Sequence, residues 1–175
     1  MHLPFVFSRK SAIFVRCKYT YDDVMKKKVM AVASIGGHWV QLLRIARPME
    51  ERFDMVYVST HPKCATMVEG QKFYQTADFS RSDAWRLIPS FLKTVKMIRR
   101  ERPDAIITTG AAPGLIYLLA GWLLRKKTIW IDSIANVEHL SLSGRIASKF
   151  ASRTYTQWED LAGSKIFYSG TILGN

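Results

Sequence analysis

Short apolar runs alternate with amphipathic segments along most of the chain. The runs have the length and the β-branched composition of buried strands, and the segments between them repeat apolar residues at helical spacing. Because strands that alternate with helices favour a parallel sheet covered on both faces, we expect a single Rossmann-like α/β domain. The pattern predicts strands at residues 29–34, 55–59, 105–109, 128–131 and 153–157, with a weaker one near 73–77, and helices at 39–49, within 84–100, at 114–124 and at 144–151.

The first predicted strand ends in a glycine turn that leads directly into a helix. Gly36 and Gly37 follow Ser34, and His38 then falls in the first helical turn. The backbone N–H groups at such a helix start are free and, with the helix dipole, attract a phosphate or another anion. An imidazole at this position is able to take a proton from a bound hydroxyl group. A tight connection with a solvent-facing histidine is the alternative, because short glycine motifs have low specificity by themselves.

Small or polar residues also follow other predicted strands. A second small-residue turn, with Gly110, Ala111 and Gly114, opens the helix after residues 105–109. Doubly wound sheets bind ligands at the carboxyl ends of their strands, so we expect these strand ends to form one cleft with the first glycine turn. Ordinary loop polarity or helix capping, for example by Ser143, is the alternative for each segment taken alone. The other polar residues at these strand ends are Asp132, Ser133, Asn136, Glu138, Gln157 and Trp158.

The length and the charge of the chain narrow its class. Its 175 residues are enough for one well-buried domain and too few for two of ordinary size. The formal net charge of +12 is uneven, since residues 1–28 and 81–102 each carry seven Lys or Arg against two acidic residues. Such clusters attract nucleic acid or anionic lipid, or form a solvated surface. We interpret residues 1–26 as a basic N-terminal arm or an overlong start, and expect the compact domain at 27–175.

The predicted helix within residues 84–100 is both amphipathic and basic. An ordinary helix packed on the sheet explains this pattern, and so does a helix that lies on an anionic membrane with Trp85 and Phe91 dipping into it. No apolar run reaches the ~20 residues of a membrane-spanning helix, so any attachment is expected to be peripheral. Ile88, Leu92, Val95 and Ile98 share the apolar face with Trp85, Phe91 lies beside it, and Arg86, Lys93 and Lys96 lie away from it.

Several common sites are missing from the sequence. The first glycine turn lacks the third glycine of the G-x-G-x-x-G dinucleotide fingerprint. Neither a phosphate-binding P-loop nor a G-x-S-x-G nucleophile turn occurs, and no clustered Cys/His pattern indicates zinc. We therefore expect no cofactor and no bound metal. Binding of nucleic acid is a lower-ranked alternative that rests on charge alone, because no recognition motif accompanies the charge.

Three ordered motifs carry a resemblance to a known family. An acidic-Ser start at Asp132 continues through Asn-Val into Leu-Ser-Leu-Ser-Gly, which ends at Gly144. A Gln-Trp-x-acidic-Leu stretch follows from Gln157, and an aromatic-x-Gly-x-Ile stretch surrounds Gly170. Together with the glycine turns, this order resembles the acceptor-binding, membrane-anchoring subunit of two-piece GT-B glycosyltransferases. One branch of that family serves dolichol-linked oligosaccharide assembly, as a subunit of an N-acetylglucosaminyltransferase at the endoplasmic reticulum. Bacterial relatives of the PssD type act in exopolysaccharide synthesis.

The resemblance implies roles for particular residues. His38 is the first candidate for the base that deprotonates the acceptor hydroxyl, and Asp132 is the second, acting directly or by orienting His38. Gln157, Trp158 and Gly170 are expected at the interface with a donor-binding partner chain. A lipid-pyrophosphate-linked sugar acceptor is expected to contact Ser34, Gly36, Gly37, Gly110, Ala111, Gly114, Ser133, Asn136, Glu138 and Ser141.

Three departures from the family pattern refine this expectation. Many relatives carry an acidic residue three positions after the histidine, where this chain has Gln41, and eukaryotic members often have Glu in place of Asp132. Eukaryotic members also usually have an N-terminal transmembrane helix, which residues 1–28 do not supply. This last departure favours a bacterial-type protein that is peripheral on the cytoplasmic face of the inner membrane, held there by its basic patches.

The resemblance therefore implies a subunit of a heteromeric, inverting glycosyltransferase that is active only with its partner. A complete enzyme of this class has an acceptor half and a nucleotide-sugar half, each Rossmann-like, and this chain ends near Asn175, where the first half would end. The partner is then expected to hold most of the UDP-sugar. A non-catalytic membrane scaffold for the donor-binding subunit is the main alternative.

Overall fold

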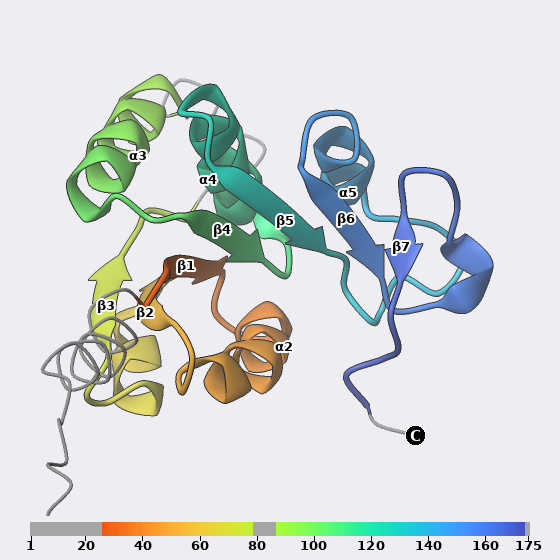
Figure 1. Cartoon of the computed structure of the whole chain (residues 1–175), viewed down its shortest axis with the longest axis horizontal. Coiled ribbons are helices and arrows are strands. Elements are labelled where there is room, and N and C mark those ends of the chain that lie inside the picture. The colour runs from red at the N-terminus through yellow and green to blue at the C-terminus, as the bar shows by residue number, and fades with distance from the viewer. Residues whose placement is uncertain (1–25, 79–86, 174–175) are drawn as a thin grey trace, which may run out of the picture.

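The computed structural model describes residues 26–78 and 87–173, which form a parallel sheet with helices on both faces (Figure 1). The expected α/β fold is therefore confirmed. The strands are β1 Lys28–Ala33, β2 Asp54–Ser59, β3 Lys72–Gln75, β4 Ala105–Thr108, β5 Lys127–Ile131, β6 Arg153–Thr156 and β7 Phe167–Tyr168. The α-helices are α2 Gly37–Ala46, α3 Leu87–Glu101, α4 Ala111–Leu123 and α5 Leu142–Ala147, and short 3-10 helices lie at Arg47–Met49, Pro62–Met67 and Glu159–Leu161.

The order of the strands creates a switch point in the middle of the sheet. The order is β3-β2-β1-β4-β5-β6-β7, and all neighbours are parallel. The chain first moves outward from β1 to β3 and then returns to the other side of β1 to continue through β4 to β7. Because β–α–β crossovers are right-handed, this reversal puts α2 on one face and α3, α4 and α5 on the other (Figure 1). Doubly wound sheets bind ligands at such a switch point, which here lies beyond the carboxyl ends of β1 and β4.

Two apolar layers hold the helices onto the sheet. On the α2 face, Trp39 and Leu42 pack against Tyr57, and on the opposite face Ile98 and Tyr117 belong to a second buried cluster. Alternate residues of β1 enter the two layers, which explains why the strand is a continuous apolar run rather than an alternating one. Burial of a side chain of this size contributes about 1.5–3 kcal/mol, so both layers are needed to offset the entropy of ordering the chain.

The structure corrects several predicted boundaries. The helix after β1 is α-helical only to Ala46, because Pro48 lacks the N–H that would continue the pattern, and it ends as a 3-10 turn. Helix α5 begins at Leu142 rather than residue 144, and its cap is Ser141 instead of Ser143, since the Ser141 hydroxyl accepts a hydrogen bond from Gly144 N at 2.9 Å. Strand β7 was not predicted, because two residues are too few to show a period.

Helix α3 does not have the single apolar face that the sequence predicts. Ile98 is fully buried, and Phe91 and Val95 pack against the core, whereas Ile88 and Leu92 are 72% and 62% exposed. The prediction that Phe91 is an outward-facing membrane residue is therefore not supported by its position. Hydrophobic periodicity does not distinguish a core-facing stripe from an adjacent exposed one, because both have helical spacing.

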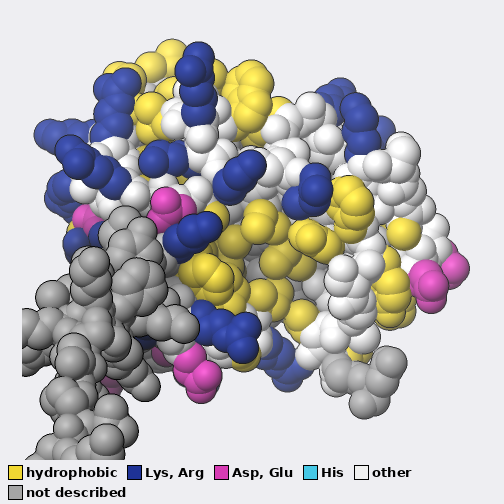
Figure 2. Space-filling view, viewed as in Figure 1, with side chains coloured by type: hydrophobic (Ala, Val, Ile, Leu, Met, Phe, Trp, Pro, Cys, Tyr) yellow, Lys and Arg dark blue, Asp and Glu magenta, His cyan; other side chains and the backbone are white. Residues whose placement is uncertain are grey.

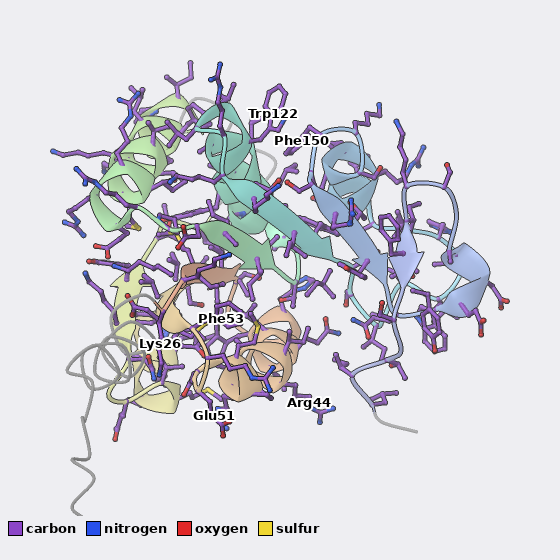
Figure 3. All side chains as sticks on the ribbon, in the orientation of Figure 1. Lys26, Arg44, Glu51, Phe53, Trp122 and Phe150 are labelled. Atoms are coloured by element: carbon purple, nitrogen blue, oxygen red, sulfur yellow. The ribbon has the colours of Figure 1, made fainter. Side chains whose placement is uncertain are left out.

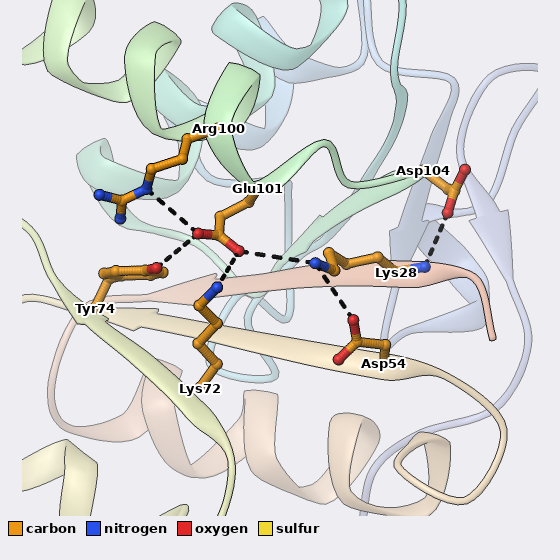
Figure 4. Close-up of polar contacts among 7 residues, drawn as sticks. All are labelled: Lys28, Asp54, Lys72, Tyr74, Arg100, Glu101 and Asp104. Atoms are coloured by element: carbon orange, nitrogen blue, oxygen red, sulfur yellow. Dashed lines mark hydrogen bonds and ion pairs between the residues drawn. The ribbon is translucent and has the colours of Figure 1, made fainter. Parts of the chain in front are cut away.

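A buried carboxylate ties the end of α3 to the sheet (Figure 4). Glu101 is 4% exposed and accepts hydrogen bonds from Lys72 Nζ at 2.7 Å and Tyr74 OH at 2.6 Å. Lys28 and Arg100 lie 3.8 and 3.4 Å from its oxygens. Burial by itself raises the pKa of Glu101, but the two hydrogen bonds and the neighbouring cations outweigh it, so the net effect is a lowered pKa. This cluster joins α3 to β1 and β3.

Candidate functional site

Two glycine-led helix starts meet at the switch point. Helix α2 begins after Gly36 and α4 begins after Gly110, at the carboxyl ends of the neighbouring strands β1 and β4. Both glycines have a positive φ, 97° and 134°, a conformation that glycine adopts without strain. Neither helix start has a side-chain cap. The first-turn N–H groups and the positive ends of both helices are thus available to an anion at this edge of the sheet.

His38 lies between these two helix starts. Its Nδ1 is 2.9 Å from the carbonyl oxygen of Thr109, and the Thr109 hydroxyl donates to the His38 carbonyl at 2.6 Å. A Cβ atom added to Gly110 would lie 2.6 Å from Cε1 of His38, so the imidazole rests directly over this glycine. A carbonyl oxygen only accepts hydrogen bonds, so Nδ1 carries the proton in the neutral ring and Nε2 keeps its lone pair. The imidazole therefore has a proton acceptor, Nε2, next to two helix starts that lack side-chain caps.

Asp132 is the centre of a hydrogen-bonded loop between β5 and α5. The side chain is 2% exposed, and each of its oxygens accepts two hydrogen bonds. Oδ1 accepts from Trp130 Nε1 at 2.9 Å and Ser141 Oγ at 2.7 Å, and Oδ2 accepts from Asn136 Nδ2 and Ser141 N, both at 2.9 Å. Four donors occupy the acceptor sites of a carboxylate. This geometry favours a role in holding the loop, and Asp132 as an alternative base stays a prediction.

Gln41 links α2 to the same loop. Its Nε2 lies 3.4 Å from Ser133 Oγ, and its side chain is 7% exposed. Within the described residues, no donor reaches its Oε1. Because a buried amide oxygen without a partner is costly, Gln41 offers an unused acceptor next to the predicted site.

The remaining predicted contacts lie around this edge with different exposures. Ser34 is nearly buried at the end of β1, Glu138 is exposed, and Gly114 packs against Thr108, where a Cβ would overlap the threonine side chain. Ala111 has φ 64°, a left-handed conformation that costs a non-glycine residue about 1–2 kcal/mol. Arg102 and Arg125 adopt the same conformation just after the ends of α3 and α4, so a ligand-binding role for the second turn stays a prediction.

The residues predicted at the partner interface surround the C-terminal segment. Gln157 is 5% exposed and accepts a hydrogen bond from Ile172 N at 3.0 Å, while Trp158 donates to the Ile134 carbonyl at 3.0 Å. Gly170 is exposed and lines a pocket of about 280 Å³ together with Gln157. The pocket is also lined by Ile45, Ile131, Tyr155, Thr156, Ser169, Thr171 and Ile172.

The predicted membrane residues are only partly described. Trp85 and Arg86 lie outside the described residues, and Lys93 and Lys96 are exposed on α3. The neighbouring helix α4 adds Trp122, which is 48% exposed and contacts Phe150 with the rings tilted by 54° and their centroids 5.8 Å apart (Figure 3). Apolar side chains lie among Lys and Arg over α3 and α4 (Figure 2). Across the described ranges, none of the helices is both long and apolar enough to cross a membrane.

Comparison with known proteins assigns this arrangement to a family. Residues 80–172, more than half of the chain, match the family described as "Oligosaccharide biosynthesis protein Alg14 like". The chain is also 35% identical over 162 residues to the UDP-N-acetylglucosamine transferase subunit ALG14 of Yarrowia lipolytica, an alignment that covers 77% of this chain and 75% of the relative. The chain belongs to the Alg14-like family. The expected membership, and with it the class of glycosyltransferase subunits, is confirmed.

A second group of relatives is about twice as long. A UDP-N-acetylglucosamine–N-acetylmuramyl-(pentapeptide) pyrophosphoryl-undecaprenol N-acetylglucosamine transferase of Bacillus cereus is 25% identical over 164 residues, which cover 84% of this chain and 46% of the relative. Among solved structures, MurG of Acinetobacter baumannii superposes with a TM-score of 0.69 at 15% identity, over 82% of this chain and 45% of that one. This structural likeness confirms the fold, and the chain spans about half the length of these relatives.

Sequence reasoning missed one residue of the site. Thr109 is fully buried and makes two hydrogen bonds to His38, 71 residues earlier in the chain. The only sequence signal for a role of Thr109 was its position directly before the second glycine turn. The local pattern does not show which distant residue lies opposite the end of a strand. Gln41 was noted only as a departure from the family pattern, and the structure adds its contact with Ser133.

Proposed function

We propose that this chain is the acceptor-side subunit of an inverting glycosyltransferase. It binds a lipid-pyrophosphate-linked sugar and works with a partner chain that holds most of the UDP-sugar. The observation that carries this proposal is the convergence of two uncapped helix starts on His38, which combines an anion site with a proton acceptor. The names of the Alg14-like relatives and of the longer bacterial transferases support the UDP-N-acetylglucosamine chemistry.

The pyrophosphate of the acceptor is the anion that fits the two helix starts. It carries negative charge on two linked phosphates, and α2 and α4 each direct N–H groups and a positive helix end to the same edge of the sheet. Gly36 and Gly37 let the phosphate oxygens approach the backbone closely, since both are exposed and open space lies where a Cβ would stand. The acceptor sugar would then extend toward the loop held by Asp132, where Ser133 and the exposed Glu138 are the nearest predicted contacts.

His38 supplies the base for the transfer. The acceptor hydroxyl gives its proton to Nε2 while its oxygen forms a bond to the anomeric carbon of the donor sugar. The bond between that carbon and the diphosphate oxygen breaks, and its electron pair leaves with UDP. Attack opposite the leaving group inverts the anomeric configuration. A positioned general base contributes typically about 10²–10⁴-fold to the rate, and binding both substrates side by side adds to this.

A partly open face of the sheet is the proposed docking surface for the donor-side partner. Helices normally cover both faces of a parallel sheet, and α5 covers one face next to β5. The other face keeps the apolar pocket that Ile45, Ile131, Tyr155 and Gly170 line. Closing this pocket with apolar side chains of the partner would bury surface that is now open to water and would bring the donor half to the carboxyl edge of the sheet.

The surface of α3 and α4 is proposed to rest on an anionic membrane, the cytoplasmic face of a bacterial inner membrane. Ile88 and Leu92 on α3 and Trp122 and Leu123 on α4 are exposed apolar side chains. Lysine and arginine side chains are interspersed with apolar ones over these two helices (Figure 2). Each well-placed cation contributes about 1 kcal/mol on anionic lipid, and the apolar side chains add burial at the interface. Exopolysaccharide assembly as the pathway stays a prediction.

A transfer assay on the reconstituted complex tests the function. The chain is co-purified with the donor-side partner, and transfer from a UDP-sugar to a pyrophosphate-linked lipid sugar is measured with each chain alone and with both. We expect transfer only with both chains. His38→Ala should lower kcat by about 10²–10⁴-fold without loss of the complex.

His61→Asn is the matched control for the loss of a histidine. His61 caps a 3-10 helix by accepting from Lys63 N, and asparagine preserves this cap, so near wild-type transfer is expected. Full activity of His38→Ala would contradict the catalytic role. The membrane-scaffold alternative would be favoured if transfer requires this chain but proceeds equally well in an intact complex with His38→Ala.

A further inference from the structure

Thr109 and His38 hold each other through two hydrogen bonds that run in opposite directions. The Thr109 carbonyl accepts from the His38 ring at Nδ1, 2.9 Å away, and the Thr109 hydroxyl donates to the His38 backbone carbonyl at 2.6 Å. Thr109 is fully buried, so neither bond competes with bulk water at the threonine. The pair joins the carboxyl end of β4 to the first turn of α2, and it controls both the backbone and the ring of the histidine.

The neighbouring glycine completes the constraint on the ring. A Cβ at Gly110 would lie 2.6 Å from Cε1 and 2.7 Å from Nδ1 of His38, distances that real Cβ atoms do not show. Any side chain at this position would therefore push the imidazole away from the Thr109 carbonyl. The absence of a side chain at Gly110 leaves the space that the Cε1–Nδ1 edge of the ring occupies, while Nδ1 bonds to the Thr109 carbonyl and Nε2 lies farther from the glycine.

We infer that Thr109 is the positioning residue for His38: the hydrogen bond to its carbonyl selects the Nδ1–H tautomer, the bond from its hydroxyl holds the first turn of α2, and together they direct Nε2 toward the acceptor hydroxyl. The inference rests on the proposed function for its catalytic consequence, but its structural content is independent of that function. Without the hydroxyl bond, the first turn of α2 loses one of its two links to β4. The ring then has freedom to rotate, and a base that is misplaced by about an ångström loses much of its effect.

Two pairs of variants in the reconstituted complex test the inference. Thr109→Val keeps the shape and the backbone carbonyl but removes the hydroxyl donor, and Thr109→Ser keeps the donor. We expect the Val variant to lower kcat about tenfold with an unchanged KM, and the Ser variant to stay within about threefold of wild type. Gly110→Ala should lower kcat by about 100-fold by displacing the ring. Gly70→Ala is its control, because Gly70 also has a positive φ, 82°, but open space at Cβ.

The tautomer gives a second measurement that does not depend on activity. The full chain in its complex is labelled with ¹⁵N-histidine, and the His38 signals are assigned by their loss in His38→Gln. We expect a single Nδ1–H tautomer in the wild type and in Thr109→Ser, and a mixture of tautomers in Thr109→Val.

The two measurements separate the two ideas. If Thr109→Val shows a mixture of His38 tautomers but an unchanged rate of transfer, the result would support the positioning role of Thr109 and refute His38 as the base. An Nε2–H tautomer in the wild type would overturn the inference, and so would a Val variant in which both the tautomer and kcat are unchanged. A Gly70→Ala variant as impaired as Gly110→Ala would show that backbone strain, not ring displacement, explains the loss.

Discussion

Replacing Asp132 by asparagine separates a loop-holding carboxylate from a catalytic base. The change keeps the size of the side chain but replaces one oxygen by an NH₂ group. In the native loop each oxygen accepts two hydrogen bonds. If the new NH₂ group takes the Oδ1 position, it faces the indole N–H of Trp130. If it takes the Oδ2 position, it faces the backbone N–H of Ser141. Neither of these donors is able to reverse its role, so either orientation leaves a buried N–H opposed by another donor.

The energetic cost follows from this count. A buried donor left without an acceptor costs about 1–3 kcal/mol, and hydrogen bonds to a charged group are worth about 1.5–3 kcal/mol each. Since the remaining oxygen keeps two of its bonds, we expect Asp132→Asn to lower the free energy of unfolding by about 3 kcal/mol. For a domain of this size 1 kcal/mol shifts Tm by about 2–4 °C, so Tm should fall by about 6–12 °C.

Thermal unfolding and transfer kinetics of the complex check this expectation together. With Asp132 as a loop-holding residue, Tm falls, KM for the lipid acceptor rises and kcat changes by less than about tenfold. Asp160→Asn is the control, because Asp160 is exposed and its replacement should leave Tm nearly unchanged. An unchanged Tm combined with a kcat lowered by about 10²–10⁴-fold would refute the reasoning and make Asp132 the base.

Two further predictions concern stability and membrane binding. Glu101→Gln should lower the free energy of unfolding by about 2 kcal/mol, measured by denaturant titration. This is less than for a fully enclosed ion pair, because Lys72 is half-exposed and regains water. Asp54 is more exposed than Glu101, so Asp54→Asn is the control and should cost well under about 1 kcal/mol. Because the pKa of Glu101 is lowered in the folded state, the contribution of Glu101 to stability is present above its unfolded pKa, near 4.5, and is lost as the pH falls through the folded pKa. The wild type should therefore lose more stability in acid than Glu101→Gln does, and equal losses would contradict this. Leu92→Glu should reduce co-sedimentation of the protein with anionic vesicles severalfold. Met67→Glu, which changes an exposed residue of another segment, is the control and should not reduce it. Equal binding of both variants would argue against α3 as the membrane-binding surface.

Local patterns in the sequence were sufficient for most of the fold. The apolar runs of β1, β2, β4, β5 and β6 and the glycine turns before α2 and α4 are encoded by residues within a few positions of one another. Such signals depend on backbone propensity and on side-chain period, which are readable without knowing the partners of a segment. The family followed from ordered motifs of the same local kind. The two-residue strand β7 and the shortened α5 had no period long enough to be read.

Only the tertiary structure decided which of these residues act together. The bonds between Thr109 and His38 join positions 71 residues apart, and the buried carboxylate of Glu101, at the end of α3, depends on Lys72 and Tyr74 from strand β3. The contact between Thr109 and His38 follows from the return of the chain to the other side of β1, which places β4 next to it and brings two helix starts to one edge of the sheet. Strand order is set by pairing and packing between distant segments, so no local pattern contains it. The sequence alone therefore determined the elements and the chemistry available to them, whereas the order of the strands determined that His38 is held by Thr109 and not by Asp132.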